Sequence, residues 1–383
     1  MILIKKLTKL LAAVLSITLL SGCWDQNELN ARAIVIGVAV DRGEHAPVKI
    51  TAQIARASAI DTPQKGKSAG EKSYWNIENE GQTIFDIIRG FNHESSRKLY
   101  FPHNQIIMIS KELAEEGILQ YLDFFMRDHE TRLDVDIAVA EGKAAQLLDV
   151  KPELETLPAI NLSILINSYQ PMSHTISVDL HEFMDMLIGY SAAICPIVNL
   201  SHQSGMEVLG VTGTAVFIRD KMVGYLDPNM TRGMLWAKNK VKGGIVSVTD
   251  GQGQFEVEIK KATSKRKLEY VDGKLKVKIK AKLEGTIGSH TGGAKIQDPE
   301  VIKKIENLCN QRIKEEIVVA HDEAKRLKAD VFDYANELYK KSPKLWEQIK
   351  QDWPNIFENM ELDIDASTNI SGTGRIVQPV IPN

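Results

Sequence analysis

The 383-residue chain lacks the compositional marks of several specialised classes of protein. Its 3 cysteines are too few for a disulfide framework. No apolar run reaches the roughly 18 residues that a membrane-spanning helix needs. Lys and Arg number 47 against 50 for Asp and Glu, so the chain lacks the basic excess typical of a nucleic-acid binder. What remains, 43% hydrophobic and 25% charged residues, is the composition of a globular protein.

Motifs for catalysis, cofactors and metals are also missing. Gly66–Ser68 is similar to the end of a phosphate-binding loop, but Asp61 stands where that loop needs a glycine. His93 and His181 are each followed by Glu, yet neither begins an H-E-x-x-H zinc motif. We therefore expect no enzymatic activity, no metal and no cofactor. A Ser-His-Asp triad stays open, because its members can come from distant parts of a chain.

The N-terminus has the features of a lipoprotein sorting signal. Three lysines within residues 5–9 precede an apolar core at 10–20, which is too short to span a bilayer. The sequence L-S-G-C follows, with the small side chains and the cysteine of a bacterial lipobox. We predict cleavage between Gly22 and Cys23, a diacylglyceryl thioether on the Cys23 thiol and an acyl group on its freed amine. The alternative is an ordinary secretion signal with an incidental cysteine.

Cleavage at this position would change the charge and the anchoring of the chain. Loss of residues 1–22 removes three lysines, which takes the formal net charge from −3 to −6. Two acyl chains are roughly what stable membrane attachment requires. Cys195 lies in an apolar run and Cys309 in a helical pattern, so both are expected to be buried thiols. A disulfide between them is left open for an extracytoplasmic protein.

The pattern along the chain predicts an elongated α+β protein with mixed and antiparallel sheets and flanking helices. We divide it into a signal peptide at 1–22, an N-terminal mixed α/β region at 23–200 and a C-terminal region at 206–383 with an antiparallel sheet. The turn-rich residues 201–205 separate the last two. Apolar runs and helical spacings predict strands at 33–40, 48–55, 73–78, 106–109, 135–140 and 192–198, and helices at 83–91, 111–126, 144–148 and 180–190.

The C-terminal region, possibly two subdomains, is predicted to contain long strands and one long helix. Asp298 and Pro299 supply the N-cap and first-turn proline of a helix over 299–327. Strands are expected at 208–219, 222–226, 243–248, 254–262 and 275–283. Two late strands, at 362–364 and 374–380, are expected to return to the sheet that begins at Val208.

One strand carries an unusual row of lysines. Lys274, Lys276, Lys278, Lys280 and Lys282 alternate with apolar residues, which places five ammonium groups on one face of the strand. Such a face would suit anionic lipid headgroups. Acidic residues also alternate on the preceding strand, so we predict instead a solvent-exposed face with acidic neighbours.

Several segments together define a family resemblance. Cys23-Trp24-Asp25 and Glu28-Leu29 lead into a strand that ends in Asp41, and further segments follow at 81–89, 100–114 (YFPHNQIIMISKELA), 121–132, 213–217 (GTAVF) and 221–226 (KMVGYL). In this order, over nearly the whole mature chain, they resemble the Ger(x)C spore germination lipoproteins. These are the C subunits of nutrient germinant receptors.

The resemblance implies a non-enzymatic, lipid-anchored subunit outside the spore inner membrane. It implies three domains, and assembly with a multi-spanning A subunit and a transporter-like B subunit. Nutrient binding is attributed to those membrane subunits, so Cys23 is the only site residue carried over, and ligand-binding residues stay unknown. Two other functions remain as alternatives. An extracytoplasmic solute-binding lipoprotein that delivers a nutrient to a transporter would show an interlobe cleft, and an extracytoplasmic hydrolase would show a polar catalytic constellation.

Overall fold

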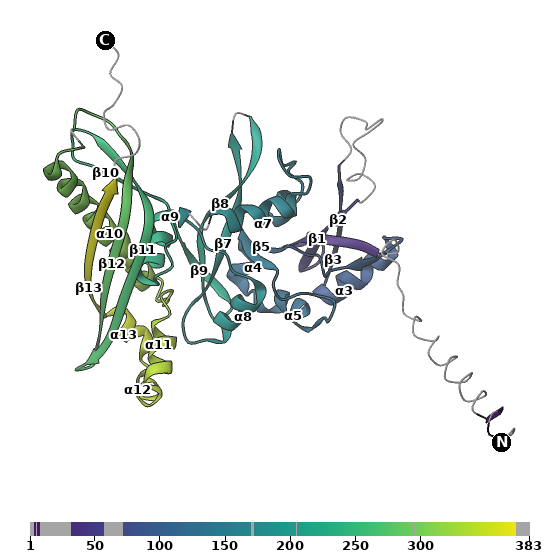
Figure 1. Cartoon of the computed structure of the whole chain (residues 1–383). Coiled ribbons are helices and arrows are strands. Elements are labelled where there is room, and N and C mark those ends of the chain that lie inside the picture. The colour runs from purple at the N-terminus through teal and green to yellow at the C-terminus, as the bar shows by residue number, and fades with distance from the viewer. Residues whose placement is uncertain are drawn as a thin grey trace, which may run out of the picture.

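Two β-sheets lie side by side along an elongated body (Figure 1). The computed structural model describes residues 4, 6, 7, 32–56, 72–169, 172–203, 205–294 and 296–372. The first strand, β1 (Arg32–Asp41), belongs to the larger sheet and lies at the end of the body remote from the smaller sheet (Figure 1). The predicted α+β class, with mixed sheets and flanking helices, is confirmed.

The larger sheet has nine strands among the described residues. Its centre is parallel and its two ends are antiparallel. The predicted boundary at 201–205 falls at the turn between two of its paired strands. In spatial order the strands are β3 (Tyr74–Gly81), β2 (Val48–Ala55), β1, β5 (Ile106–Ser110), β6 (Asp136–Ala140), β7 (Ala193–Gln203), β8 (Met206–Ile218) and β9 (Lys221–Leu226), with β4 (Lys98–Tyr100) beside β1.

Both faces of the larger sheet are buried. Along β5, Ile107 and Ile109 enter one hydrophobic core, while Ile106 and Met108 enter another on the opposite face. Strands of this kind need continuous apolar runs, because side chains of both parities leave water. The core on one face is completed by α6 (Ala144–Leu147) and α7 (Pro158–Tyr169), and the core on the other by α3 (Ile84–Gly90), α4 (Lys111–Glu116), α5 (Leu119–Arg127) and α8 (Leu180–Ile188).

The single helix predicted at 111–126 is wrong in one respect, because the chain forms two helices there. Gly117, between α4 and α5, has a φ of 145°, which interrupts the helical hydrogen bonds. Glycine reaches this conformation because it has no Cβ. The break lets the Ile118 amide donate to the carbonyl oxygen of Asp220 at 2.7 Å, which attaches α5 to the β8–β9 turn.

The smaller sheet consists, in order, of β10 (Ile245–Thr249), β11 (Gln254–Val271), β12 (Lys274–His290) and β13 (Glu361–Gly372). Asp272 and Gly273 form the turn between β11 and β12. The expectation that the late strands return to the sheet of Val208 is wrong, because β13 pairs in parallel with β12. The second late strand, 374–380, lies outside the described residues.

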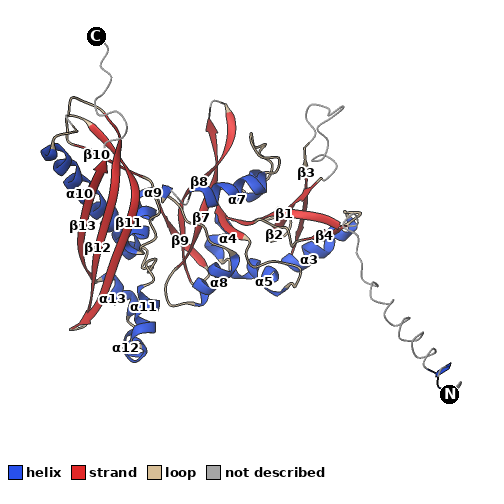
Figure 2. Cartoon of the chain, viewed as in Figure 1, coloured by secondary structure: helices blue, strands red, loops and turns tan. Residues whose placement is uncertain are grey.

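One face of the smaller sheet is covered by α10 (Pro299–Arg326), which matches the helix predicted at 299–327 (Figure 2). The helix buries Ile305, Ile313 and Ile317 against the sheet. After it come α11 (Tyr334–Lys341), α12 (Pro343–Ile349) and α13 (Trp353–Glu358), and then β13. Because α10 crosses the sheet and these short helices turn the chain back, β13 enters beside β12.

The two sheets are joined through α9 (Pro228–Ala237), which packs against α10. The helices approach so closely that a Cβ added at Gly233 would lie 2.0 Å from the carbonyl oxygen of Glu316. Beside this contact, the buried Arg232 and Glu316 side chains form an ion pair, with Arg232 Nε 2.9 Å from Glu316 Oε2. One continuous hydrophobic core therefore extends from the larger sheet to the smaller.

Both remaining cysteines are free and buried, as predicted. Cys195 lies in β7 and Cys309 in α10, and no disulfide joins them. Burial raises the pKa of both thiols, to about 12 for Cys309. Neither is a reactive thiolate at neutral pH.

Candidate functional site

The predicted lipidation site, Cys23, and the cleavage position after Gly22 lie outside the described residues. The described chain resumes at Arg32, at the start of β1 and at one end of the body (Figure 2). None of the described helices has the length and apolar character needed to cross a membrane.

Among the described residues, the histidine and acidic side chains do not come together in a metal site. Within the described ranges no group of three His, Cys, Asp or Glu side chains could hold a metal ion. His181 is exposed and lies 3.2 Å from Asp185 on the same helix. His321 is buried in a hydrogen-bonded stack, with Nε2 2.8 Å from the Tyr334 hydroxyl. Burial lowers the pKa of His321 to about 3, so the ring stays neutral.

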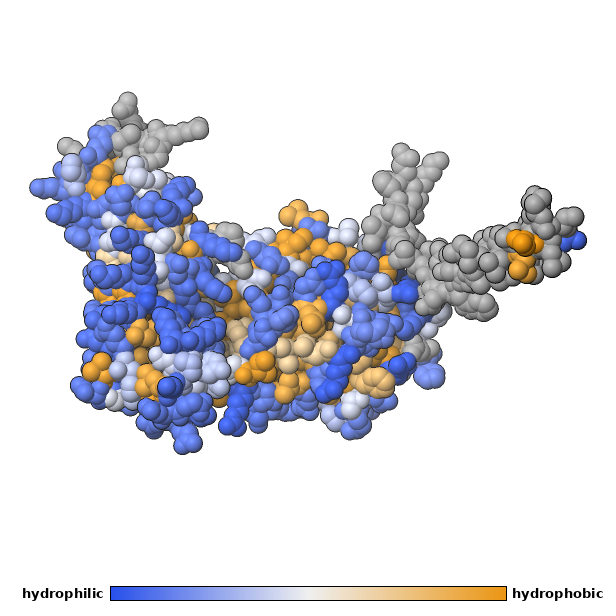
Figure 3. All heavy atoms as spheres, turned by 60° about the horizontal axis from the view of Figure 1, so that its bottom comes forward, coloured by the Kyte–Doolittle hydropathy of each residue, from blue (hydrophilic) through white to orange (hydrophobic). Residues whose placement is uncertain are grey.

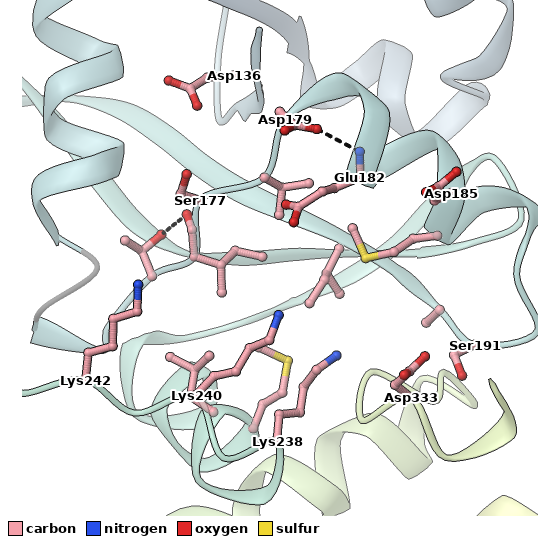
Figure 4. Close-up of a pocket in the computed structure, with 18 of the residues that line it drawn as sticks. Asp136, Ser177, Asp179, Glu182, Asp185, Ser191, Lys238, Lys240, Lys242 and Asp333 are labelled. Atoms are coloured by element: carbon pink, nitrogen blue, oxygen red, sulfur yellow. Dashed lines mark hydrogen bonds between the residues drawn. The ribbon is translucent and has the colours of Figure 1, made fainter. Parts of the chain in front are cut away.

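A cleft of about 1030 Å³ lies between the larger sheet and the elements that lead to the smaller one. Figure 4 shows carboxylates on and before α8 on one side and a row of lysines after α9 on the other. The mouth is completed by residues at the start of α11. The lining therefore combines segments near 136, 179, 240 and 333, which are far apart in the sequence.

The acidic wall is organised by local structure. Asp179 caps α8, accepting a hydrogen bond from the Glu182 amide at 2.7 Å. Asp136 at the start of β6 is buried and accepts from the Ser163 hydroxyl at 2.5 Å and from Asn167 Nδ2 at 3.1 Å. Burial raises the pKa of Asp136 to about 6, although both hydrogen bonds favour its charged form. Glu182 and Asp185 extend this wall from exposed positions on α8.

The basic wall is the segment that leaves α9. Lys238, the C-cap of α9, is partly buried, and its ammonium donates to the Val331 carbonyl oxygen at 3.1 Å. Burial lowers the pKa of Lys238 to about 8. Asn239 follows in the left-handed conformation with a φ of 57°, and Lys240 and Lys242 are exposed in the cleft. Our sequence reasoning missed this wall, although the alternating letters K-N-K-V-K were its one available signal.

With walls of opposite charge, the cleft fits a ligand or polypeptide segment that carries both signs of charge. The cleft is therefore a candidate binding surface.

The lysine row on β12 is solvent-exposed, as we predicted, and has acidic neighbours along part of its length. All five lysines lie on the face of the smaller sheet away from its core, and the alternating apolar residues are buried. Lys278 lies 3.1 Å from Glu269 on β11, and Lys276 lies 3.9 Å from Glu361 on β13. Acids on the neighbouring strands thus pair with Lys274, Lys276 and Lys278, whereas Lys280 lies opposite Lys265 of β11. The surface at this end of the body is mainly hydrophilic (Figure 3).

Comparison with known proteins identifies the class. Residues 25–200 match the family model described as the spore germination protein N-terminal domain, and residues 212–374 match the one described as spore germination B3/GerAC like, C-terminal. Spore germination protein KC of Bacillus subtilis is 25% identical, with 96% of each chain covered. Spore germination protein A3 of the same organism is 23% identical, covering 96% of this chain and 98% of the relative.

A solved structure supports the same assignment at the level of the fold. The crystal structure of the GerBC protein covers 88% of this chain and 97% of its own, with a TM-score of 0.55 at 19% identity. The chain belongs to the Ger(x)C family of spore germination proteins, and its role lies in spore germination. The family resemblance inferred from the sequence is confirmed.

Proposed function

We propose that this chain is a lipid-anchored, non-enzymatic subunit of a nutrient germinant receptor. In this proposal it is tethered through Cys23 to the outer face of the spore inner membrane and acts by assembly with membrane-embedded A and B subunits. The observation that carries the proposal is a lipobox placed directly before two regions that match the family models. The division into a signal at 1–22 and regions at 23–200 and 206–383 belongs to the same proposal.

Assembly is a sufficient mechanism for such a subunit. A lipid anchor confines the folded chain to the membrane surface, which raises its effective concentration near the other subunits. The acyl chains and the protein contacts then both contribute to a stable complex.

Replacing the lipidated residue tests the anchor. Cys23→Ala should abolish lipid attachment, because no thiol remains to form the thioether, and should leave an unprocessed or released protein. Ser21→Ala, which keeps a small residue before the cysteine, is the matched control and should be processed normally. Mass spectrometry of the membrane and soluble fractions measures signal cleavage and attached lipid in both variants. Lipid on the Cys23→Ala protein would disprove the anchoring model.

Deleting the gene tests the role. We expect loss of one nutrient response of the spore, with germination by other routes intact. An unchanged response to every nutrient would contradict a receptor role.

Co-purification tests assembly. The A and B subunits should co-purify with the wild-type chain, and this association should be lost in Cys23→Ala.

The cleft favours a second candidate, a solute-binding lipoprotein. Its volume suits a small ligand, and its walls offer charges of both signs. Under the assembly proposal, calorimetry with the protein lacking residues 1–23 should show no tight binding of amino acids or sugars. Stoichiometric micromolar binding that is lost in Lys238→Met would replace the assembly proposal with direct nutrient sensing.

A further inference from the structure

Basic and aromatic side chains gather at the end of the body where the described chain resumes. We name this group the tether-end cluster; it comprises Phe85, Arg89, Arg97, Lys98, Tyr100 and Arg32. Arg32 and Lys98 are direct partners on the parallel strands β1 and β4. Arg97 and Lys98 follow η2 (Phe91–His93), the short helix that continues from α3.

The aromatic rings in the cluster support its guanidinium groups. The Arg32 guanidinium lies 4.3 Å from the centre of the Tyr100 ring, and the Arg89 guanidinium 5.1 Å from that of Phe85. Phe85 is 55% exposed, although it is a large apolar side chain. Basic side chains beside an exposed apolar ring such as Phe are typical of helices that lie at the membrane surface.

Acidic residues offset this cluster only in part. Glu130 pairs with Lys98 at 2.5 Å, and Glu94 is exposed on the same turn as Arg97. Arg89 and Arg97 form no ion pair with an acidic side chain among the described residues. With the exposed Asp86 on α3, three acids therefore stand beside the four cations of the cluster.

The short segment between Cys23 and β1 keeps the tether-end cluster close to the membrane. Arg32 lies nine positions after Cys23, with eight residues between them. Even a fully extended chain spans at most about 3.6 Å per residue, so a lipid on Cys23 holds Arg32 within about 30 Å of the bilayer. The lysine row of β12 lies at the opposite end of the body (Figure 1), and three of its five lysines pair with acids.

We propose that the tether-end cluster rests on the anionic headgroups of the membrane to which the chain is anchored. The inference rests on the proposed lipid anchor. Contact of Arg89 and Arg97 with lipid phosphates would orient the body so that the smaller sheet points away from the bilayer. The occupant is a lipid surface, because guanidinium groups, an exposed ring and a short tether to a lipid all lie at one end.

The test uses the lipidated chain in vesicles of phosphatidylcholine alone or mixed with phosphatidylglycerol. Ser96→Cys places a fluorescent label beside the cluster, and Lys282→Cys places one on the outer face of the smaller sheet. The native cysteines should not react with the label, because Cys195 and Cys309 are buried. The thiol of Cys23 is blocked as a thioether in the lipidated chain. An aqueous quencher then reports which label the membrane covers.

We expect the label at Ser96 to be quenched severalfold more slowly in the mixed vesicles, and the label at Lys282 to be equally accessible in both. High salt should remove the protection, since it screens headgroup charge. Replacing Arg89 and Arg97 by Gln should do the same without loss of anchoring. Replacing Lys265 and Lys280 by Gln, an equal loss of charge on the other sheet, is the matched control and should have no effect.

Three outcomes would overturn the inference. The first is a Ser96 label equally accessible in both vesicles while the protein still floats with them. The second is protection of Ser96 only after the other receptor subunits are added, which would assign the cluster to a protein partner. The third is protection of Lys282 instead. A chain that fails to float would refute the lipid anchor itself, and flotation separates that result from the others.

Discussion

The two sheets of this protein bury their strands differently. In β5 of the larger sheet, neighbouring residues such as Ile107 and Met108 are both fully buried, in different cores. In β12 of the smaller sheet, Ile279 is buried and Lys280 is exposed. A sheet covered on both faces requires an apolar side chain at every position of its strands. A sheet covered on one face requires one only at every second position. The smaller sheet therefore leaves a polar surface that can vary.

At the junction between the sheets, charged side chains are buried, whereas those on the polar surface are exposed. Glu316→Ala should destabilise the protein by about 3–5 kcal/mol, because it leaves the buried Arg232 guanidinium without its carboxylate. Arg232 also donates to the carbonyl oxygen of Ile245, which ties the pair to the smaller sheet. Chemical denaturation measures the change. Combining Glu316→Leu with Arg232→Met should restore much of the loss, and equal destabilisation by the single and double variants would contradict this account.

Alanine substitutions in the two strands test the difference in burial. Ile107→Ala and Met108→Ala should each cost about 2–5 kcal/mol, because each opens a cavity in a core. In β12, Ile279→Ala should cost a similar amount and Lys280→Ala less than about 0.5 kcal/mol. Denaturation midpoints give the four values. A large cost at Lys280 would show that the outer face of the smaller sheet is covered.

The acidic wall of the cleft makes a prediction about pH. The pKa of Asp136 is raised to about 6 in the folded state, so its charge reduces stability above that pH. As pH falls from about 6 towards 3.8, protonation favours the folded state, and the penalty disappears. Asp136→Asn should therefore stabilise the protein by about 1–2 kcal/mol at pH 7, and the gain should vanish near pH 4.

The neighbouring Asp134 is the control for this measurement. Arg132 lowers the pKa of Asp134, so its charged form favours the folded state above pH 3.8. Asp134→Asn should bring no gain at pH 7. Thermal unfolding between pH 4 and pH 8 would compare the two variants, and a stabilising effect of the same size in both would rule out burial of Asp136 as the cause.

Local patterns were predictable from the sequence, and contacts between distant segments were not. The alternation at 275–283 predicts a one-sided strand, and Asp298 with Pro299 predicts the start of α10, because both signals are contained in a few neighbouring residues. The partner of β13 could not be predicted, since parallel pairing with β12 joins segments about eighty residues apart and has no turn signal. The break at Gly117 depends on its contact with the β8–β9 turn.

The candidate site divides in the same way. Cys23 is marked by adjacent residues, so the lipobox was visible in the sequence. The cleft was not, because its walls come from β6, α8, the end of α9 and the start of α11. Only the folded chain brings Asp136 and Asp179 opposite Lys238 and Lys240.

The smallest expected effect concerns the ion pairs on the outer face of the smaller sheet. Lys276 and Glu361 lie 3.9 Å apart on β12 and β13, and both are well exposed. A double-mutant cycle with Lys276→Ala and Glu361→Ala should give a coupling of at most about 0.5 kcal/mol, because water and salt screen exposed charges and the long lysine side chain loses entropy when it pairs. The coupling should fall further in 1 M salt. Glu361 also lies 3.7 Å from Lys274, so Lys274→Ala with Glu361→Ala forms a second cycle with the same expectation. A coupling well above 1 kcal/mol that persists in salt would mean that this face is shielded from solvent, and the contrast between the two sheets would then fail.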